Sequence, residues 1–434
     1  MKRRLLLLLL LYFSISLSLQ AQNEPRFPKP EFDSEYEQPT VEHPEPRALR
    51  LEYLDVLILL AVMSLTAFFA LKRRSRKAIV WLSIFSLLYF GFYRVGCICS
   101  VGSVQNVAMS LFGSGYAVSL TVLAFFVLPL VFALFFGRVF CAAACPLGVI
   151  QDLVHIKSVK VPLGLQKALS LFPYIYLAFA VLFAATGSDF IICRYDPFVG
   201  IFRMDAAFHL IVLGIAFLLI GMFVGRPYCR FACPYSVPLK WMSHFSKYHL
   251  SITPDKCINC RLCEDSCPFD AIDMPTESPG KSQNKSYLQR FALYLVLIPL
   301  LAAASGFLLS ESSDLFAKVN SKVRLAEIMQ KDEEALNEEQ MTEKETFLAS
   351  GKTADELLAE TEQIRSQFYT GAWIVGIFIG AVLAIVLLQT VVFRTRTDYT
   401  PNKANCFSCG RCFDHCPVEK SEPQKPWIKK LKLN

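Results

Sequence analysis

The sequence predicts a mainly α-helical, polytopic membrane helix bundle of about seven spans with a small α+β module rich in cysteine. The chain has 434 residues, of which 54% are apolar and only 19% are charged, and its mean hydropathy is +0.40. These values lie outside the range of ordinary soluble domains. The 15 cysteines occur in a chain far longer than a disulfide-stapled scaffold, so they indicate metal or redox chemistry.

The N-terminus has the features of a secretory signal. A Lys-Arg-Arg cluster at 2–4 precedes an apolar run that ends in small and polar residues near Ala21. We predict a signal peptide over 1–21, cleaved after Ala21; an uncleaved signal anchor is the alternative. Residues 22–50 are rich in Pro, Glu and Gln, which predicts a disordered arm on the export side.

Seven apolar segments are long enough to cross a bilayer as helices. They lie near 53–71, 78–95, 117–136, 167–187, 206–224, 289–310 and 371–393. The loop at 72–77 reads Lys-Arg-Arg-Ser-Arg-Lys, and the positive-inside rule places it in the cytoplasm. Counting crossings from this loop assigns 137–166, 225–288 and 394–434 to the cytoplasm, and 96–116, 188–205 and 311–370 to the opposite side. The expected location is therefore the bacterial inner (cytoplasmic) membrane.

The segment 311–370 differs from the rest of the chain. It is dense in Glu and Lys, lacks Cys, and has Leu, Ile and Phe at helical spacing. This pattern predicts a helical hairpin on the export side. A solvated charged spacer is the favoured interpretation, and a docking surface for an export-side partner is the alternative.

Two cysteine runs share the spacing C-x2-C-x2-C-x3-C-P. They comprise Cys257, Cys260, Cys263 and Cys267 before Pro268, and Cys406, Cys409, Cys412 and Cys416 before Pro417. In two-cluster ferredoxins, three thiolates of each loop hold one 4Fe-4S cluster and the fourth reaches the other cluster. We therefore predict two 4Fe-4S clusters in one ferredoxin-like cytoplasmic module. Zinc is the competing metal, but four such closely spaced cysteines, occurring twice, favour iron–sulfur.

The ligands are expected to be exchanged between the two runs. One cluster would be held by Cys257, Cys260, Cys263 and Cys416, and the other by Cys406, Cys409, Cys412 and Cys267. The predicted organisation is a signal peptide (1–21), an export-side arm (22–50), a membrane domain with two half-repeats (51–250), a first ferredoxin half (251–288), a transmembrane helix (289–310), an export-side helical hairpin (311–370), a transmembrane helix (371–393) and a second ferredoxin half (394–434).

A second repeat, G-R-x-[FY]-C-x3-C-P, occurs at the inner ends of the third and fifth predicted spans. Its cysteines are Cys141 and Cys145 in the first copy and Cys229 and Cys233 in the second. Cysteines at i and i+4 share one helix face, so a pseudo-symmetric bundle would bring four soft thiolates together at one further iron–sulfur centre. Reduced thiols or a structural device are the alternative. The arginines of the motif, Arg138 and Arg226, are expected to snorkel to the membrane interface.

Three further cysteines precede these motifs on the predicted export side. Cys97 and Cys99 lie before the first copy, and Cys193 lies before the second. A disulfide between Cys193 and one of the other two is one interpretation, since the export compartment is oxidising. An export-side redox site is the other, because a single bridge would leave one cysteine unpaired.

With these motifs in place, the chain resembles the membrane polyferredoxins of the NapH and NosR group, which accompany periplasmic nitrate reductase and nitrous-oxide reductase. The resemblance covers roughly 53–270 and 400–420 and rests on the doubled C-x3-C-P motif followed by ferredoxin-type cysteine runs. It implies a membrane electron carrier linked to quinol or to export-side redox enzymes. The N-terminal segment is too short for the NosR flavin domain, and the insertion at 311–370 separates the ferredoxin halves, so the partner stays open.

The predicted function is electron relay between cytoplasmic-side 4Fe-4S clusters, the membrane cysteine site and a quinol-linked or export-side redox partner. Because the chain has no Walker loop, dinucleotide fingerprint or catalytic triad, we expect a component of an oxidoreductase system rather than a stand-alone enzyme. The alternatives are an assembly factor that supplies electrons for metalloenzyme biogenesis, and a redox-sensing membrane regulator. The net charge of +7 is attributed to membrane orientation, and no nucleic-acid partner is expected.

Overall fold

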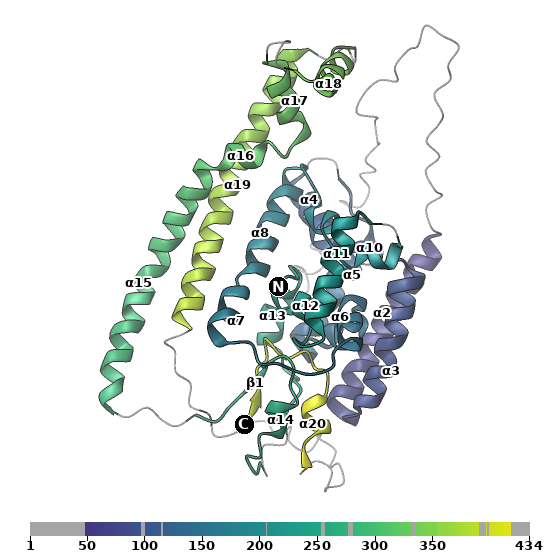
Figure 1. The fold of residues 1–434 in the computed structure, drawn as a ribbon, viewed down its shortest axis with the longest axis vertical. Coiled ribbons are helices and arrows are strands. Elements are labelled where there is room, and N and C mark those ends of the chain that lie inside the picture. Colours follow the sequence, from purple (N-terminus) through teal and green to yellow (C-terminus); the bar gives the residue numbers. More distant parts are fainter. Residues whose placement is uncertain are drawn as a thin grey trace, which may run out of the picture.

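The computed structural model describes most of the chain between residues 48 and 417 (Figure 1). The described residues are 48–96, 100–113, 116–204, 206–252, 257–276, 281–331, 336–349, 351, 353–389, 396 and 399–417. The predicted signal peptide, nearly all of the predicted arm at 22–50, and Cys97 and Cys99 lie outside these residues.

The described chain is mainly helical. The N-terminal part comprises α2 (Leu49–Ala67), a π-helical turn (Phe68–Arg73), α3 (Arg76–Ser86), a π-helical turn (Leu87–Tyr93), α4 (Ser103–Phe112), α5 (Leu120–Phe136), a π-helical turn (Phe140–Ala144), α6 (Pro146–Leu153), α7 (Leu163–Leu169), α8 (Phe172–Ala185), α9 (Ile191–Arg194), α10 (Val199–Arg203), α11 (Phe208–Gly221), α12 (Pro227–Phe231) and α13 (Ser236–His244). The C-terminal part comprises α14 (Leu262–Asp265), β1 (Ile272–Asp273), α15 (Lys281–Glu311), α16 (Ser313–Ala317), α17 (Ser321–Met329), α18 (Glu338–Ala349), α19 (Ala354–Leu388), β2 (Thr400–Pro401) and α20 (Arg411–Asp414).

Four helical stretches of the described chain are long and apolar enough to cross a membrane. They are Leu49–Arg73, Leu163–Ala185, Gln289–Glu311 and Ala354–Leu388. The other three predicted spans coincide with α3 and its π-helical extension, with α5 and with α11. Helices α5 and α11 have 17 and 14 residues, fewer than the roughly 20 that a straight crossing needs, so seven crossings stay a prediction.

Helices α15 and α19 form a closely packed pair beside the bundle (Figure 1). A capping box begins α19, in which the Thr353 side chain accepts the backbone N–H of Glu356. Close approach depends on glycine: the Ser305 hydroxyl donates to the Gly376 carbonyl at 2.7 Å, and a Cβ at Gly376 would lie 2.6 Å from the Gly306 Cα. Small residues at such a contact are typical of helix pairs in lipid.

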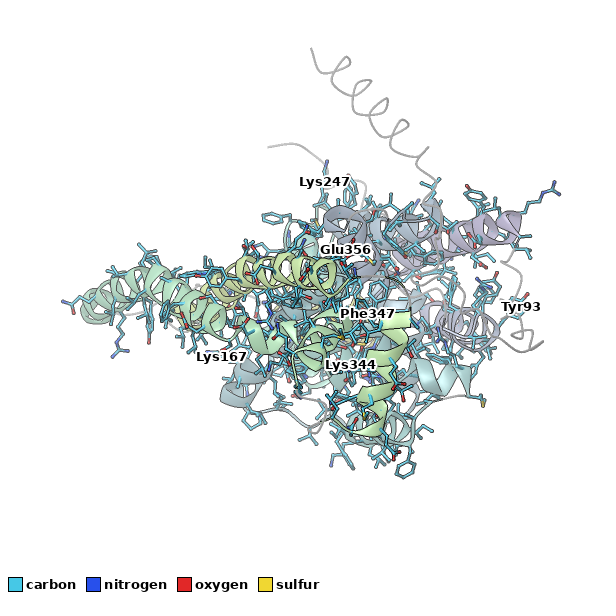
Figure 2. All side chains as sticks on the ribbon, turned by 90° about the horizontal axis from the view of Figure 1, so that it is seen from above. Tyr93, Lys167, Lys247, Lys344, Phe347 and Glu356 are labelled. Atoms are coloured by element: carbon cyan, nitrogen blue, oxygen red, sulfur yellow. The ribbon has the colours of Figure 1, made fainter. Side chains whose placement is uncertain are left out.

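Residues 311–370 form α16, α17, α18 and the first part of α19. They lie at one end of the molecule, opposite the end that carries β1, α14 and α20 (Figure 1). Figure 2 looks onto this end, where Lys344 and Phe347 lie on α18 and Glu356 lies on α19. Phe347 is buried against Ala326 and Leu357, so a small apolar core holds these short helices on α19.

The two cysteine-rich segments form one unit, although about 140 residues separate them in the sequence. Strands β1 and β2 pair antiparallel, with Ile272 opposite Pro401 and Asp273 opposite Thr400. The Asp273 carboxylate also binds Arg396 at 2.7 Å and accepts a hydrogen bond from Asn402 at 3.3 Å. Tertiary pairing therefore joins the halves that the sequence places on either side of α15 and α19.

Candidate iron–sulfur sites

We call the unit formed by residues 257–276 and 399–417 the ferredoxin-like unit. Its first cysteine set contains residues from both halves. One small cavity is lined by Cys257, Cys260, Cys263 and Cys416, together with Ile252, Ile258, Arg261 and Tyr399. These four cysteines are the set that the exchanged ligand pattern assigns to one cluster. The fourth member comes from the C-terminal half, as this pattern requires.

The second set shows the reciprocal arrangement. Electrostatic interactions place Cys412 near Cys406, Cys409 and Cys267. Cys267 also interacts with Cys409, and Cys406 with both of them. The last cysteine of the N-terminal run therefore lies with the first three of the C-terminal run.

The two cysteine loops adopt the same backbone form, which follows from their shared spacing. Asn259 and Ser408, at equivalent positions, both have φ near +53°, and Arg261 and Gly410 both have positive φ, at 62° and 78°. Left-handed residues in such loops turn successive backbone N–H groups inward, a geometry common at anionic iron–sulfur sites. Short helices α14 and α20 then begin directly after Arg261 and Gly410.

The cysteine thiols are poorly suited to carry charge without a metal. Burial raises the pKa of Cys263 to about 11 and that of Cys406 to about 12, and it raises the pKa of Cys412 well above its ordinary value. Neighbouring cysteines add to each shift, because thiolates repel one another. Bound iron would favour the thiolate over the protonated thiol, because the metal charge stabilises deprotonated sulfur. The two donor sets therefore fit iron–sulfur clusters.

Within the described residues, no three His, Cys, Asp or Glu side chains converge closely enough to hold a single metal ion. A cubane has four irons, each of which takes one thiolate, so its ligands surround a body larger than one ion.

The four C-x3-C-P cysteines also come together. Cys141, Cys145, Cys229 and Cys233 line one enclosed cavity, and all four are buried. Cys145 interacts electrostatically with the other three, and burial raises the pKa of Cys229 to about 12. We call these residues the inner cysteine site.

The two motif copies position their cysteines through proline and a distorted helix. Cys141 lies in the π-helical turn Phe140–Ala144, and Cys145 is extended because Pro146 follows it. Pro146 then occupies the first turn of α6, where its missing N–H costs no hydrogen bond. In the second copy, Cys229 lies on α12, and Cys233 follows that helix as the residue before Pro234.

The expectation that Arg138 and Arg226 snorkel to the membrane interface is wrong. Arg138 is 1% exposed and Arg226 is fully buried. Arg226 pairs with Asp152 and donates to the carbonyl of Cys141, and Arg138 donates to the sulfur of Cys141 at 3.7 Å. These partners offset the cost of removing each guanidinium from water, which snorkelling would otherwise avoid.

The same arginines connect the inner cysteine site to the ferredoxin-like unit. The Arg138 guanidinium lies 4.2 Å from the centre of the Phe407 ring, and that of Arg226 lies 5.4 Å from Phe407 and 5.6 Å from Phe269. The two rings are in contact, with centroids 4.7 Å apart. Phe407 comes directly after Cys406, and Phe269 comes two residues after Cys267, so both rings adjoin cysteines of the second set.

Sequence reasoning missed this aromatic pair and the buried glutamine Gln151. The Gln151 side-chain amide donates to the sulfur of Cys229 at 3.3 Å. A signal for it exists in the sequence, because C-x2-G-x2-Q occurs twice. One copy is Cys145, Gly148 and Gln151, and the other is Cys99, Gly102 and Gln105.

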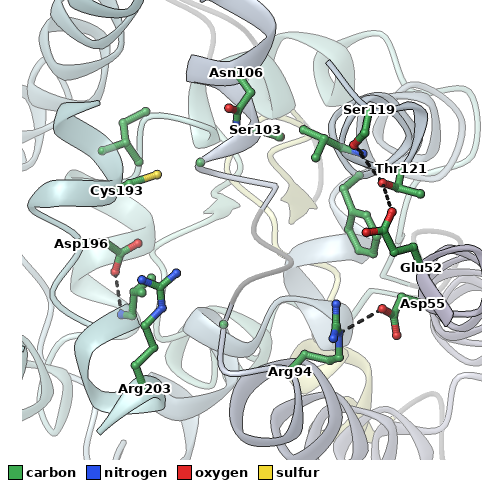
Figure 3. Close-up of a pocket in the computed structure, with 16 residues that line it drawn as sticks. Glu52, Asp55, Arg94, Ser103, Asn106, Ser119, Thr121, Cys193, Asp196 and Arg203 are labelled. Atoms are coloured by element: carbon green, nitrogen blue, oxygen red, sulfur yellow. Dashed lines mark hydrogen bonds and ion pairs between the residues drawn. The ribbon is translucent and has the colours of Figure 1, made fainter. Parts of the chain in front are cut away.

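Cys193 lies on α9 and lines a cavity of about 210 Å³ (Figure 3). Asp196 and Arg203 flank it, and Glu52, Asp55 and Arg94 line the opposite wall. The ion pair of Arg94 with Asp55 measures 3.0 Å. Cys193 forms no disulfide with another described cysteine; its pairing with Cys97 or Cys99 stays a prediction, since both lie outside the described residues.

Gly225 permits close contact between the membrane bundle and the ferredoxin-like unit. A Cβ at Gly225 would lie 2.6 Å from the carbonyl oxygen of Pro268. We expect Gly225→Ala to loosen this contact at a cost of about 1–3 kcal/mol, because the backbone must move. Hydrogen exchange over 257–276 would measure it. Gly164→Ala is the matched control, since nothing lies within 4 Å of its added Cβ; equal exchange in both variants would contradict the prediction.

Comparison with known proteins relates these sites to iron–sulfur families. Residues 118–162 and 206–253, which contain the two C-x3-C-P motifs, match a family described as 4Fe-4S binding domain. Residues 250–273, which contain the first ferredoxin-type run, match a second family with the same description. No solved structure matches the chain.

Relatives cover the central part of the chain. An uncharacterized protein of Methanocaldococcus jannaschii is 31% identical over 152 residues, which is 33% of this chain and 56% of the relative. Protein NirI of Paracoccus denitrificans is 31% identical over 153 residues, 32% of this chain and 22% of the relative. The regulatory protein NosR of Stutzerimonas stutzeri is 25% identical over 207 residues, 44% of this chain and 28% of the relative.

The match thus spans little more than half of the first of these relatives and under a third of the other two. Among the described residues, the helices supply four candidate membrane spans, and the matched families bind 4Fe-4S clusters. The predicted resemblance is confirmed: this chain is similar to the membrane-bound 4Fe-4S polyferredoxins of the NapH and NosR-like group.

Proposed function

We propose that this protein relays electrons between two 4Fe-4S clusters on the cytoplasmic side, a third centre at the inner cysteine site, and a quinol-linked or export-side redox partner. Each cluster, when bound, supplies a one-electron redox couple. The observation that carries the proposal is the placement of three four-cysteine sets in one continuous region, linked by buried aromatic and arginine side chains.

The ligands we propose for the two ferredoxin-type clusters are the two exchanged sets. Cys257, Cys260, Cys263 and Cys416 would hold one, and Cys406, Cys409, Cys412 and Cys267 the other. The common cavity of the first set and the mutual electrostatic contacts of the second support this assignment.

The inner cysteine site is proposed as the third centre. Its four buried sulfurs form a soft donor set, and the family matched by both motif copies is described as 4Fe-4S binding. Arg138 and Arg226 lie beside it and bring positive charge to a site where four thiolates would otherwise repel one another. Phe407 contacts both arginines and adjoins Cys406, so the gap between the two sites is filled by packed side chains.

One smaller cavity lies between the inner cysteine site and the cavity that contains Cys193. This apolar cavity shares Cys145 and Phe140 with the inner site, and shares Phe125 and Val199 with the cavity that contains Cys193. Since a bilayer core is about 30 Å thick, electrons crossing it need an intermediate stop. We propose that Cys193, with Cys97 and Cys99, forms an export-side redox site or a disulfide at the end of this line.

The proposal includes the orientation of the chain in the membrane and the side on which each segment lies. The basic loop at 72–77 favours a cytoplasmic ferredoxin-like unit in the inner membrane, a signal over 1–21, and an export-side position for 311–370. The placement of α16–α18 at the end opposite β1 and α14 supports the last of these (Figure 1).

Iron and acid-labile sulfide analysis of the anaerobically purified protein, with EPR of the dithionite-reduced form, tests this function. We expect about twelve irons and three 4Fe-4S signals if all three sets hold clusters. About eight irons would restrict the clusters to the ferredoxin-like unit and contradict the third centre. Zinc without iron would overturn the electron-transfer function.

A further inference from the structure

Gln151 is a buried polar side chain that donates a hydrogen bond to a cysteine of the inner cysteine site. It lies on α6, six residues after Cys145, and is fully buried. Its Nε2 group donates to the Leu147 carbonyl at 2.7 Å and to the sulfur of Cys229 at 3.3 Å. Its Oε1 atom accepts the backbone N–H of Tyr228 at 3.0 Å. Both amide hydrogens and the carbonyl are therefore occupied, and the side chain cannot turn away from the sulfur without losing these bonds.

The contact joins the two motif copies. Gln151 belongs to the segment after the first C-x3-C-P motif, and Cys229 is the first cysteine of the second. Hydrogen bonds to ligand sulfur are among the factors that set the reduction potential of an iron–sulfur centre. A donor stabilises the reduced state more than the oxidised state, because reduction adds negative charge that the sulfurs share.

The C-x2-G-x2-Q pattern that contains Gln151 occurs a second time, and its glutamine there is Gln105. Gln105 is also fully buried, and its Oε1 atom accepts the backbone N–H of Ile192 at 3.0 Å, as Gln151 accepts that of Tyr228. Ile192 precedes Cys193 as Tyr228 precedes Cys229, and Gln105 Oε1 also accepts the backbone N–H of Cys193 at 3.3 Å. The difference is at Nε2, which in Gln105 has no hydrogen-bond partner among the described residues. The glutamine thus anchors the backbone in both copies, but among the described residues only Gln151 donates to a sulfur.

We propose that Gln151 is a positioning residue that raises the reduction potential of the inner cysteine site through its hydrogen bond to Cys229. The proposal rests on the proposed function, because it requires a redox centre at this site. It assigns separate consequences to the two glutamines: Gln151 acts on the potential of the inner cysteine site, whereas Gln105 holds the backbone at Ile192 and Cys193, away from that site.

The test compares Gln151→Met with Gln105→Met in the full-length, anaerobically purified protein. Methionine has a similar volume to glutamine but cannot donate a hydrogen bond, so both variants lose the same groups at equivalent buried positions. The readout is an EPR-monitored redox titration of each iron–sulfur signal, with iron content measured in parallel.

We expect Gln151→Met to lower the equilibrium constant for reduction of the inner centre about tenfold, which is 59 mV for a one-electron couple. The two ferredoxin signals should stay in place, and Gln105→Met should leave the inner potential unchanged. An inner signal whose potential is the same in Gln151→Met and the wild type would overturn this inference while leaving the proposed function intact.

Two other outcomes would also overturn the proposal that Gln151 sets the potential of the inner cysteine site. Complete loss of the inner signal from Gln151→Met, with both ferredoxin signals retained, would make Gln151 an assembly requirement and overturn its assignment as a potential-setting residue. A wild-type protein with only the two ferredoxin signals would remove the third centre from the proposed function and this inference with it.

Discussion

Replacing Cys416 with serine is expected to remove the cluster associated with the N-terminal cysteine run, although Cys416 itself belongs to the C-terminal run. The reason is the shared cavity, in which Cys416 completes the set of Cys257, Cys260 and Cys263. Iron content should fall by about four per chain, and one EPR signal should disappear. Serine lacks the soft thiolate that this metal centre prefers, so partial retention at this position is not expected.

The matched control is Cys267→Ser, which makes the same change at the equivalent position of the other run. It should remove the cluster of Cys406, Cys409 and Cys412 and leave the first cluster in place. Cys260→Ser should reproduce the spectrum of Cys416→Ser, since both residues line one cavity. If Cys260→Ser instead matched Cys267→Ser, each run would hold its own cluster and the exchanged assignment would be wrong.

Replacing Cys229 with serine is expected to abolish electron transfer between the ferredoxin-like unit and a membrane-side or export-side partner. Cys229 is buried, lines one cavity with Cys141 and Cys145, and receives the Gln151 hydrogen bond, so its loss removes a ligand of the proposed third centre. The two ferredoxin clusters should persist, because none of their eight cysteines lines the cavity of the inner cysteine site. Iron analysis should again show a loss of about four per chain.

The measurement pairs stopped-flow reoxidation of the dithionite-reduced protein by a membrane quinone analogue with EPR of the remaining clusters. Fast reoxidation in Cys229→Ser would mean that electrons leave the ferredoxin-like unit directly, and the inner cysteine site would not be on the path. Cys416→Ser serves as the reciprocal control, because it should retain the inner signal while losing one ferredoxin signal.

Local spacing was enough to predict much of the candidate chemistry. The ferredoxin-type spacing identifies thiolate loops, since the same separations recur wherever three cysteines of one loop bind one cubane. The two G-R-x-[FY]-C-x3-C-P copies likewise indicate that their cysteines act together. These predictions depend only on the spacing of residues a few positions apart, because that spacing fixes which side chains share a loop or a helix face.

The lengths of the helices were less predictable, because hydropathy reports composition and not where a helix ends. The apolar segment predicted at 371–393 is the second half of α19, which begins at Ala354 behind a Thr353 cap. The predicted hairpin over 311–370 therefore shares its last residues with a candidate membrane span. Tertiary packing of Phe347 and Leu357, which hydropathy windows do not detect, sets this arrangement.

What the sequence by itself determined is where the candidate ligands and apolar segments lie: the cysteine loops, the paired C-x3-C-P motifs and the apolar runs. What only the tertiary structure decided is how they are grouped and what surrounds them. Cys267 lies with Cys412, Arg138 and Arg226 lie buried against Phe407, and Gln151 reaches Cys229. These contacts join residues about 80 to 270 positions apart, and their formation depends on packing of whole elements rather than on any local pattern.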